Sequence, residues 1–261
     1  MRSPSARGAS MAVAAMLALP AFIVAVGTAV AGPPFRTDDP EPVDYQHWEM
    51  NFFTDGTYIQ GNTSGFLPAY EVNYGVLPNV QLHAILPVSF VKPAGGGNGT
   101  GFALGDVELG VKYRFINPGD DDWYPQVGFF PLVEVPTGNQ NMGFSTGHPQ
   151  YFLPLWLQKD FDPWTVYGGG GYWINPGGGN RNYGFMGIAV WRKMSDSLNL
   201  GAEVFHQTSP AVGTPQSTGF NLGLTYDFSE NWHLLASAGT GVQNRTSTNL
   251  FSWYLAIQLT F

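Results

Sequence analysis

The end of the chain alternates strictly between apolar side chains and small or polar ones. The apolar row is Phe251, Trp253, Leu255, Ile257, Leu259 and Phe261. A side-chain period of two predicts a β-strand with one apolar face. Only 11% of the 261 residues are charged and 15% are aromatic, against roughly 25% charged in a typical soluble domain. This composition suits a sheet with one apolar and one polar face, and it argues against disorder and against a coiled coil.

The same alternation recurs along the chain. In 107–115 the apolar residues Val107, Leu109 and Val111 alternate with charged or small ones. We predict twelve strands, at 46–59, 66–76, 80–91, 103–115, 124–136, 150–159, 164–175, 183–193, 198–208, 218–228, 232–240 and 250–261. The stretch 164–175 contains Gly168 to Gly171, so its facing cannot be assigned from the pattern.

The segments between these strands alternate in length. Short connections lie at 77–79, 160–163, 195–197 and 229–231, and long ones rich in Gly, Asn, Thr and Pro lie at 92–102, 137–149, 176–182, 209–217 and 241–249. Short turns at one end and long loops at the other are typical of bacterial outer-membrane barrels. The alternative, a soluble β-sandwich, gives no reason for this regularity. We therefore predict an all-β, antiparallel transmembrane β-barrel of about twelve strands over 46–261, with both ends on the periplasmic side.

Seven tryptophans add to this prediction. Most fall near the ends of predicted strands, where aromatic girdles meet the membrane interface. They are Trp48, Trp123, Trp156, Trp164, Trp191, Trp232 and Trp253.

The first 31 residues have the pattern of a secretory signal peptide. Two arginines precede an apolar run from 11 to 31, and Ala29 and Ala31 form an A-x-A cleavage site before Gly32. An uncleaved membrane anchor is the alternative, because 21 residues could cross a bilayer. We expect a signal peptide at 1–31, an irregular segment at 32–45 and the barrel after it.

The apolar row at the C-terminus has a second interpretation. A last strand that ends in Phe resembles the signal read by the machinery that assembles bacterial outer-membrane barrels. The residues that carry this resemblance are Trp253, Leu255, Ile257, Leu259 and Phe261.

Three segments resemble a known family. They are 32–43, which begins Gly-Pro-Pro-Phe-Arg-Thr-Asp-Asp-Pro, the strand 105–115, which reads Gly-Asp-Val-Glu-Leu-Gly-Val-Lys-Tyr-Arg-Phe, and the glycine-rich 164–173. They are similar to outer-membrane transporters grouped with the meta-cleavage pathway of phenol degradation. The resemblance implies an outer-membrane barrel with a role in the uptake of hydrophobic or aromatic compounds. It implies no catalytic or binding residues.

Charged residues with the polar facing should lie in the lumen. They are Glu71, Asp106, Glu108, Lys112, Arg114, Glu134 and Glu203. Two interpretations remain open: the charges fill a closed lumen as a salt-bridged network, or they line the path of a solute. The segment 32–47 holds four prolines and four acidic residues, so it cannot lie in lipid. We predict that it folds into the lumen and pairs with Lys112 and Arg114.

Several chemistries have no support in the sequence. Cysteine is absent, the five histidines lack metal-ligand spacing, and no Gly-x-Ser-x-Gly motif occurs. With 11 basic against 19 acidic residues, nucleic-acid binding is not expected. We expect no catalytic residues, no metal and no cofactor.

The function that fits these expectations is a channel for small, hydrophobic or aromatic solutes. A structural or adhesive barrel acting through its external loops is the alternative, and a membrane-embedded hydrolase is the third candidate. The expected partners are outer-membrane lipid and lipopolysaccharide, the barrel assembly machinery and a small-molecule solute.

Overall fold

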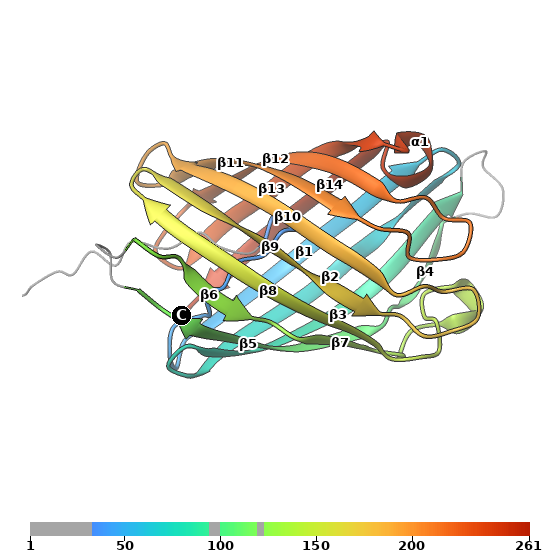
Figure 1. Cartoon of the computed structure of the whole chain (residues 1–261), viewed down its shortest axis with the longest axis horizontal. Coiled ribbons are helices and arrows are strands. Elements are labelled where there is room, and N and C mark those ends of the chain that lie inside the picture. Colours follow the sequence, from blue (N-terminus) through green and yellow to red (C-terminus); the bar gives the residue numbers. More distant parts are fainter. Residues whose placement is uncertain (1–32, 94–99, 119–122) are drawn as a thin grey trace, which may run out of the picture.

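The computed structural model describes residues 33–93, 100–118 and 123–261, which form a closed antiparallel β-barrel (Figure 1). Its strands are β1 (Trp48–Ile59), β2 (Asn62–Leu77), β3 (Val80–Pro93), β4 (Gly101–Leu104), β5 (Val107–Ile116), β6 (Gln126–Phe129), β7 (Leu132–Val135), β8 (Gln150–Phe161), β9 (Trp164–Ile174), β10 (Tyr183–Lys193), β11 (Leu198–Gln207), β12 (Ser217–Asp227), β13 (Trp232–Gln243) and β14 (Phe251–Thr260). Two short helices, η1 (Gln140–Met142) and α1 (Arg245–Thr248), lie in loops. No helix within the described ranges is long and apolar enough to cross a bilayer.

Fourteen strand segments make twelve positions around the barrel. β4 and β5 both pair with β3, and β6 and β7 both lie between β5 and β8. Gly105 and Asp106 interrupt one strand, and Phe130 with Pro131 interrupts the other. A proline breaks the ladder of hydrogen bonds because it has no N–H to donate. The predicted fold class and strand number are therefore confirmed.

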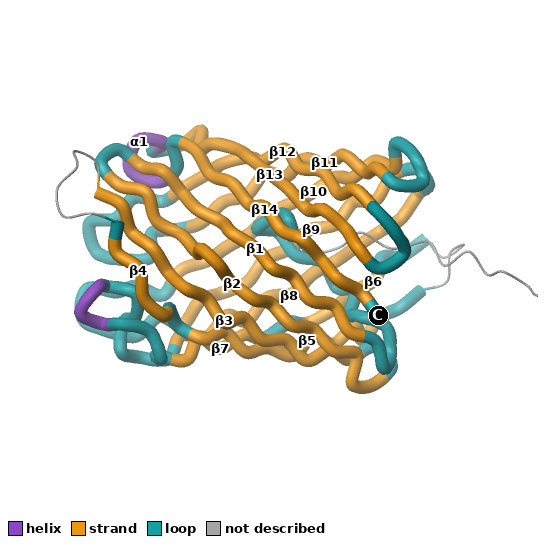
Figure 2. The backbone as a smooth tube through the Cα atoms, turned by 180° about the vertical axis from the view of Figure 1, so that it is seen from behind, coloured by secondary structure: helices purple, strands orange, loops and turns teal. Residues whose placement is uncertain are grey.

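The barrel closes by pairing its first strand with its last. β1 pairs with β14 from Glu49–Thr260 to Tyr58–Phe251. At the end of this seam, the Trp48 N–H donates to the Phe261 carbonyl at 2.7 Å, and the Phe261 N–H donates back at 3.0 Å. The seam ends at the same side of the barrel as the short turns (Figure 2).

One predicted boundary was wrong, the start of the second strand. β2 begins at Asn62, so β1 and β2 are joined by the two residues Gln60 and Gly61 at the end that carries the long loops. The polar stretch Asn62–Gly65 has the composition of a loop, but it pairs with strands on both sides. At the other end, the connection 117–125 is longer than the neighbouring turns, as the predicted strands 103–115 and 124–136 imply. Cross-strand pairing, which a single segment does not reveal, decides where β2 begins.

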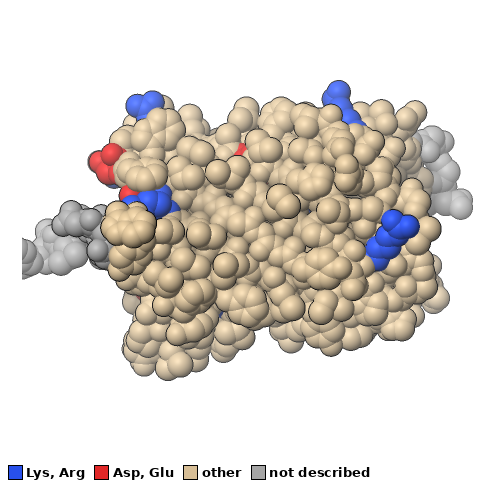
Figure 3. Space-filling view, viewed as in Figure 1, with Lys and Arg blue, Asp and Glu red and all other residues tan. Residues whose placement is uncertain are grey.

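The alternation of side chains sorts them between lipid and lumen. Leu109, Leu222 and Leu255 are 44%, 62% and 48% exposed on the outer face, whereas Lys112 and Glu203 point inward and are buried. The space-filling view shows the result, since uncharged residues cover the middle of the barrel and charges gather toward its ends (Figure 3). This arrangement is the apolar belt of a membrane barrel.

The tryptophan prediction was wrong at two positions. Trp156 and Trp191 are 1% and 2% exposed and belong to hydrophobic clusters inside the barrel. The neighbours Leu155 and Leu157 are exposed on the outer face, so the alternation of β8 turns Trp156 inward. Proximity to a strand end did not distinguish the two faces.

Candidate functional site: the lumen and its N-terminal segment

Residues 33–47, which we call the N-terminal segment, run through the inside of the barrel (blue in Figure 1). Its Phe35 ring lies against Trp191 of β10, with ring centroids 4.7 Å apart. The Pro34 carbonyl accepts a hydrogen bond from Ser237 of β13, and the Val43 N–H donates to the Gln81 side chain of β3 at 2.8 Å. The segment therefore contacts strands on different sides of the lumen.

Glu203 of β11 holds the first part of the N-terminal segment. Its carboxylate accepts from the backbone N–H groups of Arg36 and Thr37, at 3.0 and 2.9 Å, and from the Thr37 hydroxyl at 2.7 Å. A fourth donor, the Asn221 side chain, lies at 2.6 Å. The Arg36 guanidinium packs over the Phe205 ring, 4.5 Å from its centroid. Glu203 thus serves as an acceptor for the segment rather than as an open charge.

Two basic residues of β5 hold the acidic part of the segment. Lys112 Nζ lies 3.0 Å from Asp38 Oδ1 and 3.5 Å from Asp39 Oδ2. Arg114 Nη1 lies 3.3 Å from Glu41 Oε1. These are the partners that the sequence indicated for the segment. Buried ion pairs of this kind fix position more reliably than they add stability.

Glycines on the barrel wall make room for the segment. A Cβ added at Gly187 of β10 would collide with the Thr37 side chain, and one at Gly223 of β12 would lie 2.7 Å from the Phe35 ring. Both glycines face the lumen within regular strands. The inner surface of the wall is therefore complementary in shape to the N-terminal segment.

Asp38 and Asp39 differ in their preference for charge. Burial raises the pKa of Asp39 well above its ordinary value; the Lys112 ammonium opposes the rise and the Asp38 charge adds to it. Burial also acts against ionisation of Asp38, but the Lys112 ammonium and hydrogen bonds hold the pKa of Asp38 below its ordinary value. Lys112 is therefore chiefly the partner of an Asp38 carboxylate.

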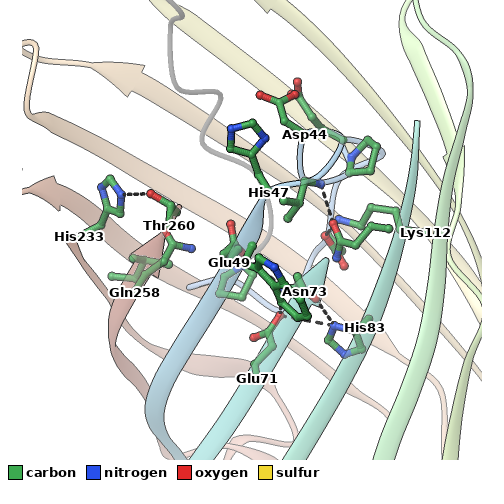
Figure 4. A pocket seen from close by; sticks show the side chains of 18 of the residues that line it. Asp44, His47, Glu49, Glu71, Asn73, His83, Lys112, His233, Gln258 and Thr260 are labelled. Atoms are coloured by element: carbon green, nitrogen blue, oxygen red, sulfur yellow. Dashed lines mark hydrogen bonds and ion pairs between the residues drawn. The ribbon is translucent and has the colours of Figure 1, made fainter. Parts of the chain in front are cut away.

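A cavity of about 540 Å³ lies beside the segment, at the end of the barrel that carries the short turns. Figure 4 shows Glu49, Glu71 and His83 on one side of it and His233 and Thr260 on the other. The size falls in the range of ~300–1,000 Å³ typical of small-molecule sites. Its lining combines acidic groups with polar uncharged and apolar ones and with two basic residues, Arg36 and Lys112.

A hydrogen-bonded network covers the acidic side of this cavity. The two ring nitrogens of His83 lie 2.7 Å from Asn73 Oδ1 and 2.9 Å from Glu108 Oε1. Asn73 donates to Glu71 at 2.9 Å and to Glu49 at 3.0 Å. The network joins β1, β2, β3 and β5, so its carboxylates are held in place across four strands.

The half of the lumen toward the long loops has an aromatic wall. Trp173 of β9 stacks between Phe152 and Tyr183, with ring centroids 4.8 and 5.8 Å apart and interplanar angles of 10° and 13°. Phe152 also belongs to a buried cluster with Trp156 and Phe185. The lumen is therefore lined by aromatic rings on the β8–β10 side and by carboxylates on the β1–β5 side.

The predicted lumen residues do not form a single path. Glu71, Glu108 and Lys112 line the cavity, and Lys112, Arg114 and Glu203 bind the N-terminal segment. Two others are held near the long-loop end. Glu134 accepts from Gln150 at 2.8 Å, and Asp106 accepts from the Gly138 backbone at 2.9 Å.

Glu49 and the hydrogen-bonding role of His83 were not predicted from the sequence. Alternation marks both: Glu49 shares the parity of the buried Asn51, and His83 shares that of the buried Gln81, whereas Phe52 and Leu82 are exposed on the outer face. Metal-ligand spacing does not mark a histidine that serves only in hydrogen bonds. Among the described residues, no group of His, Asp and Glu side chains is arranged to hold a metal ion.

Histidine–hydroxyl pairs occur at both ends of the barrel. His206 Nδ1 lies 2.7 Å from Thr218 Oγ1, while the Ser209 hydroxyl donates to backbone carbonyls of its own loop. At the short-turn end, His233 Nδ1 lies 2.7 Å from Asp227 and Nε2 lies 3.1 Å from Thr260 Oγ1. The second pair ties the β12–β13 turn to the end of β14.

A family model described as "Putative MetA-pathway of phenol degradation" matches residues 49–256. The chain belongs to this family. The matched range includes nearly all of the barrel and leaves out the N-terminal segment. No functionally curated protein matches the sequence.

Solved structures share the fold of this family member. The COG4313 outer membrane channel from Pseudomonas putida F1 superimposes with a TM-score of 0.72 at 14% identity, over 85% of this chain and 98% of that one. The KdgM porin, solved in complex with disordered oligogalacturonate, gives 0.56 at 10% identity over 82% and 99%. The NanC porin gives 0.54 at 11% identity over 81% and 98%. The protein is a multi-pass β-barrel of the outer membrane.

Proposed function

We propose that the protein is a channel for small solutes with an apolar or aromatic body, and that the N-terminal segment restricts its lumen. The observation that carries the proposal is the two-sided lumen: stacked rings lie on one wall, carboxylates on another, and a seated segment runs between them. The family description and the channel names of the similar folds support the same class of function.

The aromatic wall supports the choice of solute. Phe152, Trp173 and Tyr183 present ring faces at the end of the barrel that carries the long loops. Ring pairs of this kind contribute about 0.5–1.5 kcal/mol beyond the burial of area. A passing aromatic molecule would therefore be retained longer than an aliphatic molecule of equal size.

The test is a single-channel recording of the purified barrel in a planar bilayer. We expect phenol to interrupt the ion current more often than cyclohexanol, which has the same size and hydroxyl but no aromatic ring. Trp173→Leu should remove the difference. Tyr172→Leu is the matched control, because Tyr172 is the next residue in β9 and is 52% exposed on the lipid face. Equal interruption by both alcohols in the unaltered protein would refute the aromatic preference.

The second test concerns the N-terminal segment. Removing residues 33–44 should raise the conductance, and Lys112→Ala with Arg114→Ala should raise it in part. Unchanged conductance in both folded variants would show that the segment does not restrict the lumen.

A further inference from the structure

Arg36 of the N-terminal segment presents a cation to the lumen. The residue is exposed, whereas its neighbours Phe35 and Thr37 are buried against the wall. Its guanidinium extends to Gln207, the last residue of β11, whose side-chain oxygen accepts from Nη2 at 3.0 Å. A guanidinium has five N–H donors. In the described part of the chain, Gln207 is the one acceptor for those of Arg36, so most of the donors are available to a ligand.

The charge of Arg36 is not neutralised by a direct contact. Among the described residues, no carboxylate lies at ion-pair distance from its guanidinium. Glu203 and Asp55 act on this charge from further away. The Glu203 carboxylate already accepts four hydrogen bonds, and Asp55 accepts one from the Phe66 N–H at 2.9 Å. A carboxylate carried by a solute would therefore meet no competing protein carboxylate at the guanidinium itself.

Aromatic rings surround the same cation. The guanidinium carbon lies 4.5 Å from the centroid of the Phe205 ring and 5.4 Å from that of Phe185. Phe185 lies 6.3 Å from Phe152, which stacks on Trp173 of the aromatic wall. A continuous row of ring contacts thus joins the aromatic wall to the cation. A solute with a ring and an acidic group finds a partner for each in one place.

We propose that Arg36 binds the carboxylate of an aromatic solute whose ring rests on the aromatic wall. This inference rests on the proposed channel function and names its solute class, an arenecarboxylate such as benzoate. The planar fork of arginine matches the two oxygens of a carboxylate, and such charge-assisted bonds are stronger than neutral ones. Arg36 also borders the acidic cavity, where Glu49 and Glu71 repel an anion. The solute is therefore held at Arg36, before it reaches those carboxylates.

Calorimetric titration of the folded full-length barrel in detergent tests the site. We expect benzoate to bind roughly 10–100-fold more tightly than benzyl alcohol, which has the same ring and nearly the same size but no charge, since hydrogen bonds to charged groups have this strength. Equal affinities would overturn the inference. Calorimetry detects binding whether or not the solute passes, so a barrel that binds benzoate but conducts no current would refute the channel and leave the carboxylate site standing.

Two variants with opposite effects on the N-terminal segment test the role of Arg36. Arg36→Gln removes the cation and should reduce the affinity for benzoate to that for benzyl alcohol. Gln207→Glu places a carboxylate where the Gln207 oxygen now accepts, so an internal ion pair should occupy the guanidinium and weaken benzoate binding while holding the segment more firmly. A loss common to both variants cannot come from release of the segment.

Arg181→Gln is the matched control. Arg181 is an exposed cation in the long loop between β9 and β10, and its replacement should leave the affinity for benzoate unchanged. Heat-modifiable migration in gels verifies that each variant is folded. Unaltered benzoate binding in folded Arg36→Gln or Gln207→Glu, or an equal loss in Arg181→Gln, would overturn the assignment of the site to Arg36.

Discussion

Phe35 lies against Trp191, 4.7 Å from ring centroid to ring centroid, although 156 residues separate them along the chain. Phe35 precedes the first strand, and Trp191 lies on β10, well away from the β1–β14 seam. Tyr167 joins the same buried cluster, and its hydroxyl accepts a hydrogen bond from the Trp191 indole at 3.1 Å. Phe35, at the start of the N-terminal segment, is therefore packed like a core residue. The release of the segment from the barrel wall can be measured.

Glu203→Ala should loosen the segment. The change leaves the Arg36 and Thr37 N–H groups without their acceptor, and each buried unsatisfied group costs about 1–3 kcal/mol. The loss at one such group alone, about 1–3 kcal/mol, changes the ratio of docked to released segment by roughly 5–150-fold. Trypsin cleavage after Arg36 measures the release, since Arg36 lies inside the barrel and a protease reaches it only when the segment leaves the lumen. Glu230→Ala, in the β12–β13 turn, should leave the cleavage rate unchanged.

Gly187→Val should release the segment without removing any polar group. The added side chain would occupy the position of the Thr37 side chain. Gly184→Val in the same strand is the control, because a Cβ there meets no atom closer than 3.9 Å. We expect higher conductance and faster cleavage after Arg36 only for the Gly187 variant. If both variants conduct alike, the close fit at Gly187 is not what holds the segment.

Asp38→Asn and Asp39→Asn should act in opposite directions. The docked state lowers the pKa of Asp38, so the stability that Asp38 contributes is present above its ordinary pKa and is lost as the pH falls through the lowered value. The docked state raises the pKa of Asp39, so the stability linked to Asp39 is present at low pH and is lost as the pH rises through the raised value. At pH 7.5, trypsin should therefore cleave the Asp38 variant faster and the Asp39 variant more slowly than the unaltered protein. The opposite order would contradict the assigned pairing with Lys112.

Leu255→Arg should impair membrane insertion. Leu255 is 48% exposed on the lipid face, and an arginine near the bilayer midplane costs about 2–4 kcal/mol. Gln258→Arg should be milder because Gln258 lines the internal cavity. The amount of heat-modifiable barrel in the outer membrane measures both effects. Equal defects would mean that the two faces of β14 do not differ in environment.

Deleting Phe261 should slow assembly. The deletion removes both hydrogen bonds between Phe261 and Trp48 at the end of the β1–β14 seam, together with the last residue of the apolar row. The measurement is the amount of unfolded protein in the periplasm over time, compared with that of the unaltered chain. Replacing Phe261 with Tyr retains the ring and the backbone bonds and should restore normal assembly.

Alternation in the sequence predicted the barrel because each strand keeps one face toward lipid. The outward facing of a row such as Leu109, Val111 and Tyr113 can be predicted without knowing which strand lies beside it. The breaks at Gly105 and Pro131 and the tight turn at Gly61 were missed, because they depend on pairing between segments. The same limit applies to Trp156, whose inward position follows from its register in the sheet rather than from its residue type.

The candidate site was predicted in part. The acidic segment and its basic partners Lys112 and Arg114 follow from charge and from the exclusion of irregular backbone from lipid. The role of Glu203 could not be predicted from charge, because two of its donors are backbone N–H groups that no sequence pattern marks. The aromatic stack of Phe152, Trp173 and Tyr183 also depends on three strands coming together.

The seat of the N-terminal segment has a consequence for the order of folding. Thr37 and Glu203 are 166 residues apart, so their contact forms only after β11 has been made and placed. Contacts of such long range form late because a large loop must close first. The β1–β14 seam completes the wall around the same space. A segment that enters after the seam has closed must thread through the short-turn mouth, whereas one already in place is enclosed as the last two strands join.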